Sequence, residues 1–112
     1  MEAKAQARYL RLAPMKVRLL VRMISGRPVS EAEALLRFTP SRAARAVEKV
    51  LKSAIANAEN NLELDRATLV VSRATVDQGP VTKRMHPRAR GRADVVRRPS
   101  SHVTVVVAEP GA

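Results

Sequence analysis

Residues 79–98, GPVTKRMHPRARGRADVVRR, constrain the fold of this chain more than any other segment. The stretch contains a single acid, Asp94. Its seven basic residues are Lys83, Arg84, Arg88, Arg90, Arg92, Arg97 and Arg98. Ionised side chains are almost never fully buried unless they are paired, and one carboxylate cannot pair seven cations. The stretch therefore has to face water or a polyanion, outside any hydrophobic core.

Strand-forming sequence lies on both sides of this basic stretch. Residues 67–76 (ATLVVSRATV) and 101–108 (SHVTVVVA) are rich in valine and threonine, which are favoured in strands. Two such runs around a segment punctuated by glycine and proline predict one long antiparallel hairpin. We expect residues 79–98 to form a basic arm of this hairpin that extends beyond the sheet.

The composition indicates a single domain with an aliphatic core. A chain of 112 residues can build one modest core, so we expect one domain over residues 1–112, with residues 79–98 as its protruding arm. Hydrophobic residues make up 46% of the chain, yet Tyr9 and Phe38 are its only Phe, Tyr or Trp residues. The core should therefore be aliphatic and rich in alanine.

Three absences narrow the class of protein. Without cysteine the chain has no disulfide, thiolate nucleophile or cysteine-ligated zinc site. Its longest run without a charged residue, 99–108, is half of the ~20 residues that a membrane-spanning helix needs. The N-terminal residues lack an apolar signal region, so we expect no membrane segment and a cytoplasmic location.

Alternation and capping signals predict a strand and a first helix. Residues 2–11 alternate as in a half-buried strand. One face of this strand would carry Ala3, Ala5, Ala7 and Tyr9. Pro14 suits the first position of a helix and Gly26 suits the residues that end one, so we expect a helix over residues 14–25.

Two further helices are predicted downstream. Residues 30–33, SEAE, have the spacing of a capping box and should begin a helix over residues 30–38. Thr39 is a suitable cap for a longer helix over residues 41–60. Asparagine tolerates the left-handed conformation, so the asparagine pair 60–61 should end this third helix.

The order of these elements, one strand, three helices and two strands, predicts an α+β fold. We expect three helices packed on a small three-stranded antiparallel sheet, with the long basic β-hairpin arm extending from it. Residues 77–79, DQG, are better explained as a turn or bulge than as a functional site.

A net charge of +11 favours a nucleic-acid partner, with an anionic membrane surface as the main competitor. The first strand and helix add basic residues to those of the arm: Lys4, Arg8, Arg11, Lys16, Arg18 and Arg22. The third helix adds Arg42, Arg45, Lys49 and Lys52. A solvated helix face and a disordered basic loop are the alternatives, but one sign of charge on several elements favours a polyanion.

Catalysis and metal binding find little support in the sequence. His86 and His102 are its only bases near neutral pH, and neither has a nucleophile pattern beside it. Two histidines without cysteine cannot assemble a metal-ligand set, and no glycine-rich phosphate loop is present. We expect no catalytic residue, no metal and no cofactor.

The scarcity of aromatic residues indicates the mode of binding. Proteins that recognise unstacked single strands rely on aromatic platforms, which this chain lacks in its arm. Arginine outnumbers lysine six to one in the arm, and its planar guanidinium suits bidentate contacts with phosphates. We therefore expect recognition of folded RNA by phosphate contacts and shape.

Five segments, in order, resemble the bacterial family of ribosomal large-subunit protein number twenty-two. They are residues 8–18 (RYLRLAPMKVR), 53–61 (SAIANAENN), 79–80 (GP), 87–94 (PRARGRAD) and 101–105 (SHVTV). The resemblance implies an α+β globular part on the solvent side of the large subunit. It also implies an arm that passes through ribosomal RNA to the peptide exit tunnel, and binding of that RNA early in assembly.

Charge and resemblance together give the candidate residues and partners. The RNA-binding candidates are Lys4, Arg8, Arg11, Lys16, Arg18, Arg22, Lys83, Arg84, Arg88, Arg90, Arg92, Arg97, Arg98 and His102. The resemblance implies a tunnel-lining tip of Met85, His86, Pro87, Arg88, Ala89, Arg90 and Gly91. Expected partners are large-subunit ribosomal RNA, neighbouring large-subunit proteins and the passing nascent peptide, without a membrane or a second copy of this chain.

Two rival classes share the basic charge. A DNA-bending protein could insert a proline at the tip of a basic β-arm between base pairs, although such proteins usually dimerise and no dimer seam is evident here. A cationic membrane-active protein would need an exposed apolar helix face. Sedimentation with ribosomal particles and binding to liposomes separate these classes.

Overall fold

The computed structural model describes residues 2–87 and 93–110. The elements are β1 (Glu2–Leu10), α1 (Pro14–Ile24), α2 (Val29–Phe38), α3 (Arg42–Leu62), the 3-10 helix η1 (Arg66–Thr68), β2 (Val70–Gln78), β3 (Thr82–Pro87), β4 (Ala93–Arg98) and β5 (Ser101–Ala108). Strands β1, β5 and β2 form an antiparallel sheet in that order, and β3 pairs with β4. The α+β fold with three α-helices and a three-stranded antiparallel sheet is confirmed.

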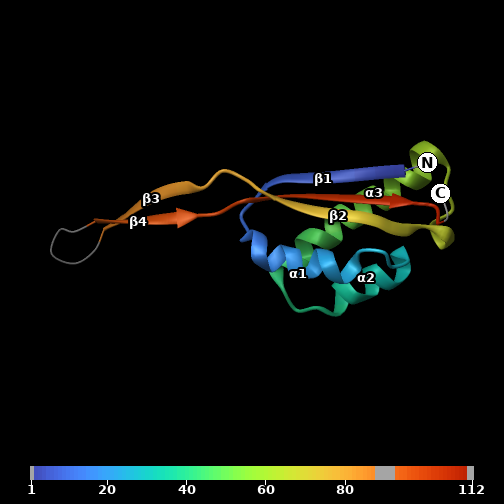
Figure 1. Ribbon diagram of the computed structural model, residues 1–112, viewed down its shortest axis with the longest axis horizontal. Helices are drawn as coiled ribbons and strands as arrows, with labels where there is room; N and C mark the ends of the chain where they lie inside the picture. The colour runs from blue at the N-terminus through green and yellow to red at the C-terminus, as the bar shows by residue number, and fades with distance from the viewer. Residues whose placement is uncertain (1, 88–92, 111–112) are drawn as a thin grey trace.

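The predicted hairpin is present as two consecutive ladders. The chain passes from β2 into β3 and returns from β4 into β5, so that β3 and β4 extend away from the helices (Figure 1). Pro80 and Pro99 lie between the ladders, where a residue without a backbone N–H costs no sheet hydrogen bond. There the Gly79 N–H donates to the carbonyl of Ser100 over 2.9 Å. The molecule measures 61 × 25 × 19 Å along its principal axes.

The hydrophobic core lies between the helices and one face of the sheet. Helix α3 packs against β1 and β5, and α1 packs against β2. The sheet contributes alternate residues of β5, Val103, Val105 and Val107, all fully buried. Buried alanines of α3 let its backbone approach the sheet closely: Ala43, Ala44, Ala54 and Ala58. The predicted aliphatic, alanine-rich core is confirmed.

Two helix boundaries differ from the predicted ones. The capping box at residues 30–33 does not form, because α2 already begins at Val29 and has no side-chain cap. Tertiary contacts set this start, since the Val29 side chain is buried and its N–H donates to the carbonyl of Leu69 over 3.1 Å. Ser41 rather than Thr39 caps α3, and its hydroxyl accepts from the N–H of Ala43.

Helix α3 also ends later than its asparagine pair suggested. It continues to Leu62, which packs against the core, and Glu63 takes the left-handed position with φ of 55°. Partial burial of this leucine favours continuing the helix by two residues over a cap at the pair 60–61. The end of α1 agrees with the prediction, since Ile24 is its last residue and Gly26 has φ of 79°.

The second strand was placed too early along the chain. Residues 66–68 form η1, and β2 begins only at Val70. The predicted turn at residues 77–79 is wrong, because Asp77 and Gln78 continue the ladder opposite β5. The irregularity lies instead between Val71 and Arg73, where one extra residue shifts the alternation.

Candidate nucleic-acid interface

The basic residues of β1, of α1 and of the loop between them are exposed and lack acidic neighbours in sequence. No aspartate or glutamate occurs in residues 3–30. Six predicted RNA-binding residues lie here, and we call them the β1–α1 cations: Lys4, Arg8, Arg11, Lys16, Arg18 and Arg22. Within residues 2–87 and 93–110, none of the six forms an ion pair. Their charge is therefore available to an external polyanion.

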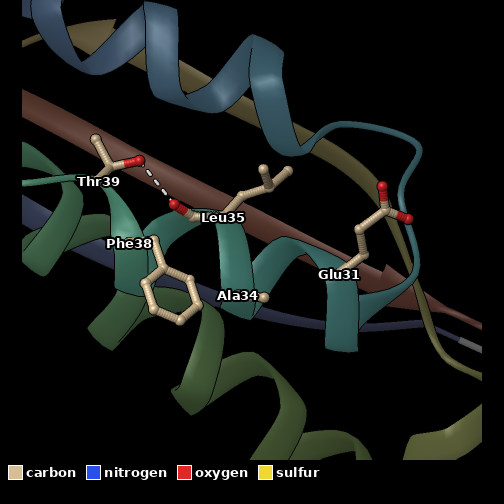
Figure 2. Close-up of a pocket in the computed structure, with 5 residues that line it drawn as sticks. All are labelled: Glu31, Ala34, Leu35, Phe38 and Thr39. Carbon is tan, nitrogen blue, oxygen red and sulfur yellow. Dashed lines mark hydrogen bonds between the residues drawn. The ribbon is translucent and has the colours of Figure 1, made fainter.

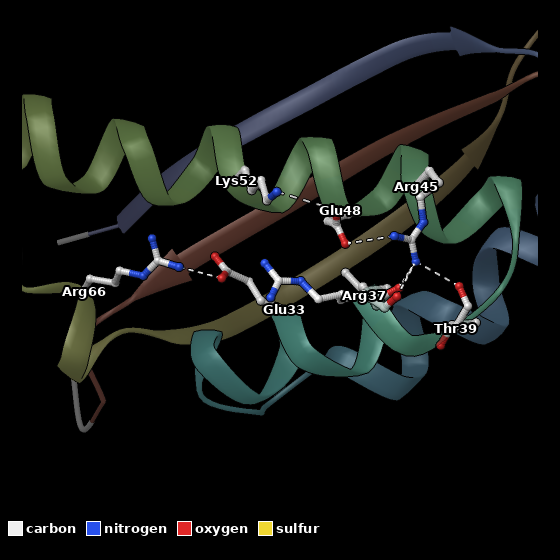
Figure 3. A network of polar contacts seen from close by, with 8 residues as sticks. Glu33, Arg37, Thr39, Arg45, Glu48, Lys52 and Arg66 are labelled. Carbon is white, nitrogen blue, oxygen red and sulfur yellow. Dashed lines mark hydrogen bonds and ion pairs between the residues drawn. The ribbon is translucent and has the colours of Figure 1, made fainter.

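Acid pairing is concentrated on α2, α3 and η1 instead. Arg66 of η1 pairs with Glu33 of α2, and Lys52 pairs with Glu48 within α3 (Figure 3). Arg27 pairs with Glu31 at the start of α2. The chain thus separates cations that are neutralised within the protein from cations that are not.

The strand and the helix present their cations in different ways. On β1, Lys4 and Arg8 alternate with alanines that are buried or packed against the core, so they lie on the sheet face that the helices leave uncovered. On α1 the buried stripe of Val17, Leu20, Val21 and Ile24 leaves the basic residues on the solvent side. Both patterns agree with the predicted alternation and helical spacing.

Arg73 is an exposed cation that the sequence analysis did not select. Lys4 of β1 and Arg73 of β2 are both Cα partners of Val106 on the central strand. The two cations therefore flank the same position on the uncovered sheet face. Simple alternation from buried Val71 would have placed Arg73 on the core face, and the irregularity between these residues reverses this.

The third helix is less available for RNA than its charge suggested. Arg45 Nη2 donates to the carbonyl oxygens of Leu36, Arg37 and Thr39, at 2.9 Å for the last two (Figure 3). Its Nη1 lies 3.6 Å from Glu48 Oε2. Arg45 therefore stabilises the C-terminal end of α2, whose last carbonyls have no partner within the helix. Of the four basic residues noted on α3, Arg42 and Lys49 stay exposed without an ion pair among the described residues.

Replacing Arg45 with methionine is expected to destabilise the fold by about 2 kcal/mol, because bonds from a charged donor to three carbonyls are lost while the apolar stem is kept. The midpoint of urea unfolding would measure the loss. Arg42→Met on the same helix is the control and should change stability by under ~0.5 kcal/mol. Equal midpoints for the two variants would contradict the capping role.

Only some of the predicted arm residues lie in the part of the chain that the structure describes. Lys83 is exposed on β3, where Arg84, Met85, His86 and Pro87 also lie. Arg97 and Arg98 belong to β4, opposite Lys83 and Thr82. Arg88, Ala89, Arg90, Gly91 and Arg92 lie outside the described residues. The predicted RNA-binding and tip roles of the arm stay predictions.

His102, the remaining candidate, is half-buried where the arm leaves the sheet. Its Nδ1 accepts a hydrogen bond from the backbone N–H of Tyr9 over 3.1 Å. The two rings are perpendicular, with centroids 4.9 Å apart. This aromatic pair had no signal in the sequence, because its partners are 93 positions apart.

Other kinds of site find no support in the described part of the chain. There, no three or more acidic or histidine side chains gather as metal ligands would. Nor does any helix in residues 2–87 and 93–110 have the length and hydrophobicity to cross a bilayer.

Comparison with known proteins assigns the chain to a family. The family described as "Ribosomal protein L22p/L17e" matches residues 5–108. The "Large ribosomal subunit protein uL22" of Desulforamulus reducens is 57% identical over 109 residues, covering 97% of this chain and 96% of that protein. Proteins of the same name from Thermoanaerobacter sp. (57%; 97% and 98% covered) and Chloroflexus aggregans (53%; 97% and 96%) are similarly close. The chain therefore belongs to the L22p/L17e family, as a structural protein of the large ribosomal subunit and not an enzyme.

Proposed function

We propose that this chain binds large-subunit ribosomal RNA, aids early assembly of the subunit and lines the nascent-peptide exit tunnel with the tip of its arm. The observation that supports RNA binding is that the cations paired with acids and the β1–α1 cations lie on different elements. The six β1–α1 cations have no ion pair among the described residues, while acids of α2 and α3 pair with Arg27, Arg45, Lys52 and Arg66. Phosphates are the natural partners for these free cations.

The folded part and the arm have different roles in this proposal. Five of the β1–α1 cations lie on β1 or α1, which pack against the hydrophobic core, and Arg11 lies in the short loop between them, so they can dock without first being ordered. A two-stranded ribbon such as β3 and β4 is marginally stable alone in water. Part of the arm's contact energy therefore offsets the entropy lost on ordering it. The folded part should supply most of the affinity, and the arm should act in the tunnel.

Deleting residues 82–84 tests this division. The deletion removes the ladder pairs of Thr82, Lys83 and Arg84 with β4, and an odd number of residues turns every later side chain of β3 to the other face. We expect near-normal incorporation into large subunits, measured by particle composition. We expect an altered tunnel, measured as a changed growth response to macrolides, which the resemblance of the tip segment implies.

The matched control replaces the same three residues with alanine, which keeps the length and the register of β3. This variant should incorporate normally and should change the macrolide response less than the deletion does. Failure of the deletion variant to incorporate would show that the arm, and not the folded part, directs assembly. Normal incorporation with an unchanged macrolide response would contradict the tunnel role.

A further inference from the structure

Tyr9 has an unusual conformation at the base of the arm. Its φ is 58°, in the left-handed region that a bulky residue seldom adopts because its Cβ is crowded there. The register between β1 and β5 shifts between Ala7 and Leu10. As a result, Leu10 packs against the core while 63% of Tyr9 is exposed.

The sequence alternation predicted the opposite arrangement. It grouped Tyr9 on one face with Ala3, Ala5 and Ala7, and in the structure that face of the strand packs on the core while Tyr9 does not, so the alternation is wrong at Tyr9. Core packing cannot explain an aromatic ring that a strained backbone turns out into solvent. Strain of this kind persists where surrounding structure enforces it, and it is concentrated at functional sites.

Contacts from the hairpin hold Tyr9 in this position. The N–H of Tyr9 donates to His102 Nδ1, and the imidazole contacts the phenol ring at a right angle, with the ring centroids 4.9 Å apart. Gly79 makes room for His102, since a Cβ there would lie 3.2 Å from its Cε1 and 3.3 Å from its Nε2, and would also clash with Ser100 Oγ. Tyr9 therefore lies where β1 meets two other segments at the start of the arm, one around Gly79 and one around His102.

The charge around Tyr9 suits an RNA partner. Arg8 and Arg11 are exposed on either side of it in the chain and belong to the β1–α1 cations. Asp77 is the Cα partner of His102 on β2, so β5 separates it from β1. His102 meets the phenol ring at a right angle and so is not stacked flat on it, and 63% of Tyr9 is exposed.

We propose that Tyr9, positioned by His102, is a platform on which one unstacked nucleobase of the large-subunit RNA stacks, while Arg8 and Arg11 meet the neighbouring phosphates. The inference rests on the proposed RNA binding and adds a stacking contact to recognition by phosphate and shape. Any base can use such a platform, since every base has a π-face. The contact would anchor the RNA where the arm leaves the sheet.

Phe38, the other exposed aromatic residue, provides a matched comparison. It is 82% exposed at the end of α2 and lines a shallow hollow of about 390 Å³ with Glu31, Ala34, Leu35 and Thr39 (Figure 2). The acid Glu31 and the absence of a cation among these lining residues disfavour an RNA phosphate here. Phe38 is therefore a control that shares the exposed aromatic ring of Tyr9 but lacks its neighbouring cations.

Fluorescence tests the stacking directly, because the chain contains no tryptophan. The full-length Tyr9→Trp and Phe38→Trp variants each carry a single indole. Binding of protein-free large-subunit ribosomal RNA should quench the emission of Tyr9→Trp and protect it from acrylamide, since a base would cover the ring. The emission of Phe38→Trp should stay unchanged. Equal responses of the two variants would overturn the proposal.

The RNA affinity of Tyr9 variants, measured over a series of salt concentrations, distinguishes a stacking contact from a charge contact. Tyr9→Leu should weaken RNA binding about tenfold, within the range for loss of one stacked base, while Tyr9→Phe should bind as the natural chain does. The slope of log K against log salt should not change in either variant, because no phosphate contact is removed. A Tyr9→Leu variant that binds normally would overturn the platform.

The Tyr9→Asn variant tests whether Tyr9 serves only to stabilise the fold. Asparagine tolerates positive φ, so this variant should unfold at the same urea concentration as the natural chain, or a higher one, yet bind RNA about tenfold more weakly. Destabilisation together with normal affinity of the folded fraction would overturn the proposal.

If the natural chain itself fails to bind the RNA, both the proposed function and the platform fail. If it binds with a steep salt slope and Tyr9 variants bind equally well, the platform alone fails.

Discussion

Replacing all six β1–α1 cations with glutamine is expected to lower the affinity for large-subunit ribosomal RNA on the order of a thousandfold at ~0.15 M salt. Each cation that meets a phosphate releases counterions and contributes ~0.7 to 0.9 to the slope of log K against log salt. Six contacts therefore account for a slope change of roughly 4 to 5. Filter binding over a series of salt concentrations measures both quantities.

A matched pair of triple variants separates specific contacts from net charge. The first replaces Lys16, Arg18 and Arg22 with glutamine, and the second replaces Arg27, Lys52 and Arg66, which pair with acids of the protein. Both lower the net charge by the same amount. The first should reduce the salt slope by roughly 2 to 3 and the second by under ~1. Equal reductions would show that only total charge matters.

The predictable part of this fold rests on local patterns. The buried stripe of α1, the alternating valines of β5 and the strand-forming runs around the arm were enough to predict an α+β fold with a hairpin. These patterns are strong because each element has one face on a single aliphatic core. The observed bounds of α1 and β5 differ from the predicted ones by no more than one residue at either end.

The errors occurred where contacts between distant segments override the local pattern. Alternation grouped Tyr9 on one face with the alanines of β1, but the bulge before Leu10 and the bond to His102 turn it outward. Helix spacing placed Arg45 on a free basic face, but the end of α2 supplies three carbonyls that bind it. The sequence shows a residue's charge and its place in a helix or strand pattern. The partners of Tyr9 and Arg45 come from distant segments, which only the folded chain brings together.

Charge was a better guide to the class of protein than to which cations are neutralised within it. Membership in the L22p/L17e family places the protein in the large ribosomal subunit, and so in the cytoplasm, and removes the DNA-bending and membrane-active rivals. The structure then divides the cations into neutralised and available sets. Sequence could not make this division, because the pair between Arg66 and Glu33 joins residues 33 positions apart.

We expect this chain to recognise large-subunit ribosomal RNA specifically and not to bind nucleic acid as a general polycation. The most direct test is competition at ~0.2 M salt, in which labelled large-subunit RNA bound to the full-length chain is displaced by unlabelled large- or small-subunit RNA. Specific binding by nucleic-acid proteins typically exceeds non-specific binding by 10³-fold or more. We predict that small-subunit RNA competes at least a hundredfold less well per nucleotide. Equal competition by the two RNAs would contradict the account.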